Sequence, residues 1–104
     1  MENKGEEKLC EAAKLGDVAT ITLLIDAGHD VTYFDANGLT PLMHAAKHGH
    51  TQVVRKLLEV GAPWNALSPS SLSAGDFAMQ EGHQDSYDIL LNTGKISILQ
   101  LKYE

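Results

Sequence analysis

The sequence predicts an all-α helical solenoid, built from about three repeats of paired antiparallel helices with projecting turns. Two observations support this prediction. Shifting the sequence by 33 residues against itself superimposes two columns of glycines, Gly16, Gly49, Gly82 and Gly28, Gly61, Gly94. The same shift superimposes small and apolar residues, Ala12, Ala45, Ala78 and Leu24, Leu57, Leu90. Agreement at one fixed offset is typical of repeat proteins, whose units stack to share a core.

The recurring columns also place two helices within each repeat. Glycine adopts a positive φ at little cost, so it suits the residue that ends a helix. The alanine column indicates a place where two helices cross closely, and the leucines give each repeat an apolar stripe. We therefore expect one domain over residues 1–94, with repeats at about residues 6–34, 35–67 and 68–94.

The first repeat starts without a preceding turn. Its opening segment, residues 5–9, is rich in charge, which suits the terminal unit of a stack because its outer face contacts water. Cys10 falls in the same column as Met43 and Asp76, on the first helix of its repeat. We expect Cys10 to be a small, partly buried residue.

The second repeat is the most regular of the three. Residues 35–38, Asp-Ala-Asn-Gly, predict a turn. Thr40 and Pro41 then predict a helix start, because threonine caps helices and proline fits the first helical position. We expect helices over about residues 41–48 and 51–60, with Leu57 in the core.

The third repeat departs from the pattern at its start. Residues 73–76, Ser-Ala-Gly-Asp, replace the threonine and proline, so we expect its first helix to begin later or more loosely, with Asp76 as a possible cap. After Gly94, where a helix end is expected, residues 95–104 form an irregular apolar tail. Three alternatives stay open for this tail: a cap on the last repeat, a self-associating end, or the start of a longer segment.

Composition and charge exclude several classes of partner. The 104 residues carry a formal net charge of −6, which argues against nucleic acid and against an anionic membrane surface. The single cysteine excludes an internal disulfide, and with the acidic N-terminus it leads us to expect a protein of the cytoplasm, the nucleus or both. We expect a monomer, with self-association through the tail as the alternative.

The period of 33 residues and the Gly-Leu-Thr-Pro-Leu segment at residues 38–42 resemble the ankyrin repeat. The match is densest in the second repeat, at Asp35, Gly38, Thr40, Pro41, Leu42, Ala45, Ala46, Gly49, His50, Val53, Val54, Leu57, Leu58, Gly61, Ala62 and Asn65. Met43 departs from the family pattern, because it stands where the consensus has a histidine. The hydrogen bonding of that histidine is therefore in doubt here.

The resemblance implies a protein-interaction module, since ankyrin stacks bind other proteins through their projecting turns and concave face. Carried over to this sequence, that surface comprises Phe34, Ala36, Asn37, Leu39, Lys47, His48, Trp64, Leu67, Pro69, Ser70, Leu72, Gln80 and Glu81. Two alternatives stay open within it. Leu39 and Leu72 could pack between neighbouring turns, and Trp64 could be a half-buried anchor instead of a contact for a partner.

The sequence gives no sign of catalysis. It contains no glycine-rich phosphate loop, nucleophile elbow or paired carboxylates, so we assign no catalytic or cofactor-binding residue and expect no enzyme activity. His44 and His48 have a spacing that can bind zinc on a helix. However, no acidic residue or cysteine accompanies them locally, so we assign no metal ligand.

A narrower resemblance suggests a second function. Residues 62–66, Ala-Pro-Trp-Asn-Ala, and 73–78, Ser-Ala-Gly-Asp-Phe-Ala, look like the N-terminal ankyrin region of arginine N-methyltransferase 2-type proteins of fungi and plants, which are related to guanidinoacetate methyltransferases. This resemblance implies that the chain is an accessory segment, truncated or alternatively ended, of such an enzyme. The last ten residues do not resemble the start of a methyltransferase domain, so no S-adenosylmethionine site is assigned.

Overall fold

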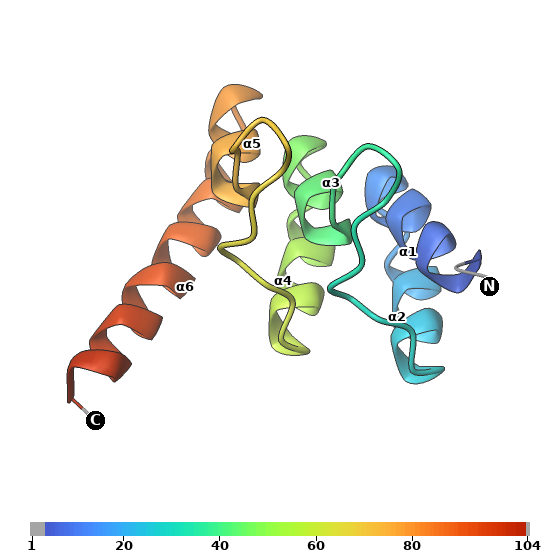
Figure 1. Cartoon of the computed structure of the whole chain (residues 1–104), viewed down its shortest axis with the longest axis horizontal. Helices are drawn as coiled ribbons and strands as arrows, with labels where there is room; N and C mark the ends of the chain where they lie inside the picture. The colour runs from blue at the N-terminus through green and yellow to red at the C-terminus, as the bar shows by residue number, and fades with distance from the viewer. Residues whose placement is uncertain (1–3, 104) are drawn as a thin grey trace.

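The chain forms successive pairs of antiparallel helices that stand side by side (Figure 1). The computed structural model describes residues 4–103, with side chains described up to residue 95. Its helices are α1 (Lys4–Leu15), α2 (Val18–Asp26), α3 (Pro41–Lys47), α4 (Thr51–Glu59), α5 (Ala74–Gln80) and α6 (Gln84–Tyr103). Over this range the structure contains no strand. The predicted all-α solenoid is therefore confirmed.

The helices form two rows. In one row α3 contacts α1 on one side and α5 on the other, and in the second row α4 lies between α2 and α6. The long connections from α2 to α3 and from α4 to α5 arch forward between successive pairs (Figure 1). Within the described residues, no helix is long and apolar enough to cross a lipid bilayer.

The core runs through the whole stack. Buried apolar side chains form one cluster that begins at Leu9 in α1 and continues to Leu90 in α6. Its centre is the second repeat, where Leu42, Val53 and Leu57 have no solvent-exposed surface. Neighbouring repeats bury each other's apolar faces, which is why a helix as short as α3 is stable in this position.

Small residues allow successive repeats to approach closely. Gly49 has a φ of +74°, and a Cβ atom there would meet the ring of His83 in the next repeat. Gly16 meets His50 in the same way, and His50 Nε2 also lies 2.9 Å from the carbonyl oxygen of Lys14. The glycine column therefore both ends helices and gives the histidine of the following repeat a place to pack.

The start of α5 corrects one sequence-based expectation. The helix begins at Ala74, in register with Pro41 of α3, and so it starts neither later nor more loosely. Ser73 is its N-cap, since the Ser73 side chain accepts a hydrogen bond from the Asp76 N–H at 3.2 Å. Asp76 completes a capping box by accepting from the Ser73 N–H at 3.0 Å. Serine with aspartate thus replaces threonine with proline.

Gly94 gives a second correction. We predicted a helix end there and an irregular tail beyond, but α6 passes through Gly94 and continues to Tyr103. A Cβ at Gly94 would lie 3.0 Å from the indole of Trp64, so glycine makes room for this ring. The three alternatives for the tail (a cap, a self-associating end or the start of a longer segment) depend on the side chains of residues 96–104. These side chains lie outside those that the structure describes, so the alternatives stay open.

Candidate protein-interaction surface

Two projecting turns have the same backbone geometry. We call residues 34–40 the first finger and residues 67–73 the second finger. In the first, the Asp35 N–H donates to the Leu39 carbonyl at 2.9 Å. In the second, the Ser68 N–H donates to the Leu72 carbonyl, also at 2.9 Å. These bonds close each turn at its base and hold both tips in a fixed relation to the helices.

The carboxylate of Asp35 braces the first finger from within. Its Oδ1 accepts hydrogen bonds from the N–H groups of Asn37 at 2.9 Å and Leu39 at 3.0 Å. Its Oδ2 accepts a hydrogen bond from His44 Nε2 in α3 at 2.7 Å. Burial alone would raise the pKa of Asp35, but these hydrogen bonds outweigh it and hold the pKa below its ordinary value of 3.8. Asp35 is therefore ionised at neutral pH.

Met43 takes over part of the role of the consensus histidine. Its sulfur lies 3.5 Å from the Thr40 N–H, while the Met43 N–H donates to the Thr40 hydroxyl at 3.2 Å. The imidazole that contacts the turn comes from the next residue, His44. Two neighbouring side chains therefore supply the contacts of this turn: Met43 contacts Thr40 at the start of α3, and His44 contacts Asp35.

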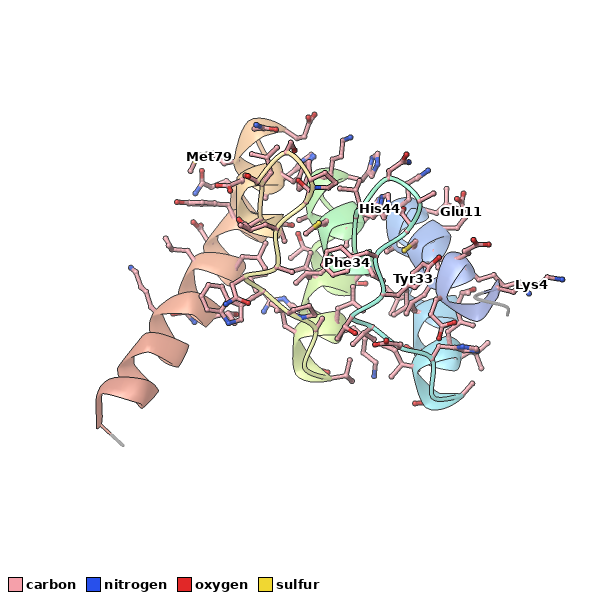
Figure 2. The ribbon with its side chains drawn as sticks, viewed as in Figure 1. Lys4, Glu11, Tyr33, Phe34, His44 and Met79 are labelled. Atoms are coloured by element: carbon pink, nitrogen blue, oxygen red, sulfur yellow. The ribbon has the colours of Figure 1, made fainter. Side chains whose placement is uncertain are left out.

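Large apolar side chains are exposed where the fingers begin. Phe34 is 47% exposed and Leu67, at the equivalent position, is 55% exposed. Phe34 lies on the connection between α2 and α3 (Figure 2). Both residues belong to the predicted partner-binding set, and about half of each side chain is accessible to a partner.

Three other predicted contact residues lie deeper. Leu39 and Leu72 are half-buried and pack against the core, and so does Trp64. For these three the structure favours the alternative of internal packing. Trp64 also lines, with Leu67 and Leu90, a cavity of about 360 Å³ between the α4–α5 connection and helices α5 and α6.

The remaining predicted residues are mostly polar and exposed. The structure exposes Ala36, Asn37, His48, Pro69, Ser70, Gln80 and Glu81. Lys47 is half-buried, and its Nζ lies 5.9 Å from the centre of the Phe77 ring, within the range of a cation–π contact. None of these placements tests partner binding, so the set stays a prediction.

Met79 is an exposed apolar residue that the sequence interpretation missed. It is 57% exposed at the end of α5 (Figure 2). The residue 33 positions earlier, Ala46 in the second repeat, is completely buried, so the 33-residue repeat did not predict that Met79 is exposed. Ala46 lies in α3, which packs between α1 and α5, whereas among the described helices α5 packs against α3 and α6.

A comparison with known protein families identifies the class. The family model described as "Ankyrin repeats (3 copies)" matches residues 9–100. Since this match covers most of the chain and agrees with the observed helix pairs, the chain belongs to the ankyrin repeat family.

Relatives show where such repeats occur. The chain is 38% identical to "Ankyrin repeat and KH domain-containing protein 1" of Homo sapiens over 76% of its own length and 3% of that protein's. It is 42% identical to "Ankyrin repeat domain-containing protein 40" of Mus musculus over 61% of its own length and 18% of that protein's. It is 34% identical to "NAD-capped RNA hydrolase NUDT12" of Macaca fascicularis over 78% of its own length and 18% of that protein's. The chain therefore spans less than a fifth of each of these relatives.

Proposed function

We propose that this chain is a non-catalytic protein-interaction module, which binds a partner protein through the two fingers and the concave face. The observation that supports this most directly is the pair Phe34 and Leu67. These apolar side chains occupy equivalent positions on two braced turns, and roughly half of each is exposed. Rigid presentation of apolar anchors favours binding, because little conformational entropy is lost on association.

The test is capture of a partner from a cell lysate by immobilised protein, followed by mass spectrometry. The double variant Phe34→Ala/Leu67→Ala should lose the specific partner while keeping its far-UV circular dichroism spectrum. A matched control is Leu15→Ala/Leu23→Ala, which removes two other exposed leucines outside the fingers. The control should retain the partner. Equal capture by the finger variant, or loss only in the control, would contradict the proposal.

The second candidate, an accessory segment of an arginine N-methyltransferase-type enzyme, rests on the resemblance at residues 62–66 and 73–78. None of the relatives named above is a methyltransferase. The chain spans only a small part of those relatives, which favours a module joined to other domains. Sequencing the gene beyond the codon for Lys95 tests this candidate: methyltransferase-coding sequence there would support it, and its absence would remove it.

A further inference from the structure

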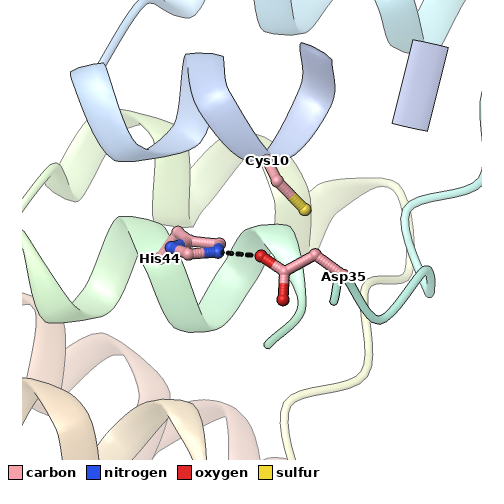
Figure 3. A group of neighbouring side chains, drawn as sticks. All are labelled: Cys10, Asp35 and His44. Atoms are coloured by element: carbon pink, nitrogen blue, oxygen red, sulfur yellow. Dashed lines mark hydrogen bonds and ion pairs between the residues drawn. The ribbon is translucent and has the colours of Figure 1, made fainter. Parts of the chain in front are cut away.

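Three possible metal ligands converge at the junction of the first two repeats. Cys10 comes from α1, Asp35 from the first finger and His44 from α3 (Figure 3). The thiol sulfur, a carboxylate oxygen and a ring nitrogen all lie within 4.8 Å of one another. Cys10 and His44 are buried, with 5% and 6% of their surfaces exposed. This cluster is separate from the exposed apolar residues assigned to partner binding.

Two of the three groups are already oriented. Asp35 Oδ1 is held by the backbone N–H groups of Asn37 and Leu39, which leaves Oδ2 directed at His44. Figure 3 shows the sulfur of Cys10 pointing from α1 toward this hydrogen-bonded pair. A carboxylate fixed by its second oxygen is the kind of outer support that metal ligands usually have. Little rearrangement of the finger would be needed to receive an ion.

The surroundings favour a cation. A cavity of about 180 Å³ adjoins the cluster, and its lining includes the side chains of Glu7, Glu11 and Lys14. Together with Asp35, the acidic groups outnumber the single lysine. Glu7 lies three residues before Cys10 and so shares its face of α1. A bound divalent cation would offset this local negative charge.

We propose that Cys10, Asp35 and His44 form a zinc-binding site, with Glu7 or water as the fourth ligand. Sulfur, nitrogen and oxygen together are a ligand set that zinc accepts in tetrahedral geometry. Bond lengths of about 2.0–2.3 Å put ligand atoms roughly 3–4 Å apart. The His44 Nε2 and Asp35 Oδ2 atoms, now 2.7 Å apart, must therefore separate slightly to admit an ion between them. Since all three ligand atoms lie within 4.8 Å of one another, no pair needs to approach by more than about 1 Å. Mg²⁺ and Ca²⁺ prefer oxygen ligands, so this site should discriminate against both.

Binding has a defined proton balance. The Cys10 thiol loses its proton to solvent as the sulfur–zinc bond forms. His44 now donates from Nε2 to Asp35, so Nε2 must give up that proton and the neutral ring must carry it on Nδ1 instead. One proton is therefore released for each zinc ion bound by the neutral histidine.

Cobalt(II) is a suitable probe because it occupies zinc sites and absorbs light when bound to thiolate. The chain has one cysteine, so a thiolate-to-cobalt band can arise only from Cys10. We expect one equivalent of Co²⁺ to produce this band in the reduced protein, and Zn²⁺ but not Mg²⁺ to abolish it. Cys10→Ser and His44→Gln should each weaken zinc binding by about 100-fold or more, measured against a chromogenic chelator, since loss of mere outer-shell partners already costs 10–100-fold.

The matched control is His48→Gln, which removes an exposed histidine one turn beyond His44. It should leave zinc affinity unchanged. A second measurement needs no variant: zinc should slow alkylation of Cys10 in the wild-type protein. Absence of the cobalt band, unchanged affinity in a folded Cys10→Ser protein, loss of affinity in His48→Gln, or alkylation unaffected by zinc would each overturn the site.

Discussion

The first and second fingers reach the same geometry with different residues. Asp35 in one and Ser68 in the other accept the N–H of the residue four positions later, at 3.0 Å and 3.2 Å. Gly38 and Ser71 both have a positive φ, of 78° and 66°. The backbone conformation is therefore common to both, whereas the side chains that stabilise it are interchangeable.

The two fingers differ in their neighbours. The second repeat is packed on both sides, and Gly38 lies directly against Pro69 of the second finger. Among the described helices, the third repeat packs mainly against α3 and α4, which belong to the second repeat. An equivalent substitution should therefore lower the free energy of unfolding more in the second repeat than in the third. In the second repeat it disturbs the interfaces with both the first and the third repeat. Matched substitutions in the two repeats test this difference.

The largest effect is expected in the core. Leu57→Ala should lower the free energy of unfolding by about 2–5 kcal/mol, because Leu57 is fully buried between neighbouring repeats. Leu90→Ala, the equivalent change in the third repeat, should cost less, since Leu90 also borders an open cavity. Urea unfolding followed by circular dichroism measures both. An equal or larger loss for Leu90→Ala would contradict the proposed difference between the repeats.

Substitutions at the two finger residues with a positive φ, Gly38 and Ser71, should change the free energy of unfolding in opposite directions. Gly38→Ala should destabilise by about 1–3 kcal/mol, because a side chain would have to adopt a positive φ and would meet Pro69. Ser71→Gly should stabilise by about 0.5 kcal/mol, as relief of the left-handed strain exceeds the added freedom of the unfolded chain. Thermal unfolding of the two variants checks this; a destabilised Ser71→Gly protein would show that the strain is absent.

The stabilisation from the first finger should depend on pH, whereas that from the second finger should not. The pKa of Asp35 in the folded protein lies below 3.8, so folding favours the ionised form. Its stabilisation is complete above about pH 3.8 and is lost as the pH falls through the folded pKa. The Asp35→Asn variant should therefore lose less stability than wild type between neutral and strongly acidic pH. Ser68→Ala, in the second finger, should leave the pH dependence unchanged; urea midpoints across pH measure both differences.

The smallest effect on stability is expected at the exposed anchors. Phe34→Ala and Leu67→Ala should each change the free energy of unfolding by less than about 1 kcal/mol, because roughly half of each side chain contacts solvent. The thermal unfolding midpoint is the measurement. A loss comparable to that of Leu57→Ala would assign these residues to the core rather than to partner binding.

Much of the fold follows from the periodic pattern. The predicted helices at residues 41–48 and 51–60 are observed as α3 and α4, each ending one residue earlier than expected. Such patterns predict backbone well, because helix starts and ends depend on residues close in sequence. Prediction failed at Gly94, where a distant contact with Trp64 explains the glycine. It also failed at Met79, whose exposure depends on which helices pack against α5.

The candidate surface was only partly predictable. The columns indicated which positions project, and Phe34 and Leu67 are exposed as expected of that surface. They gave no means to decide whether Leu39, Leu72 and Trp64 point outward, since half-buried and exposed residues share the same spacing. The sequence-level argument against metal ligands considered only residues near His44 along the chain. Folding brings Cys10 and Asp35 to His44 from two other elements.

The sequence by itself determined the repeat, its helix pairs and the turns between them, because those features depend on short-range preferences of glycine, proline, threonine and alternating apolar faces. Only the tertiary structure decided which side chains meet across repeats: His83 against Gly49, Trp64 against Gly94, and Cys10 beside Asp35 and His44. These contacts depend on the distance and rotation between stacked units, which no local preference specifies.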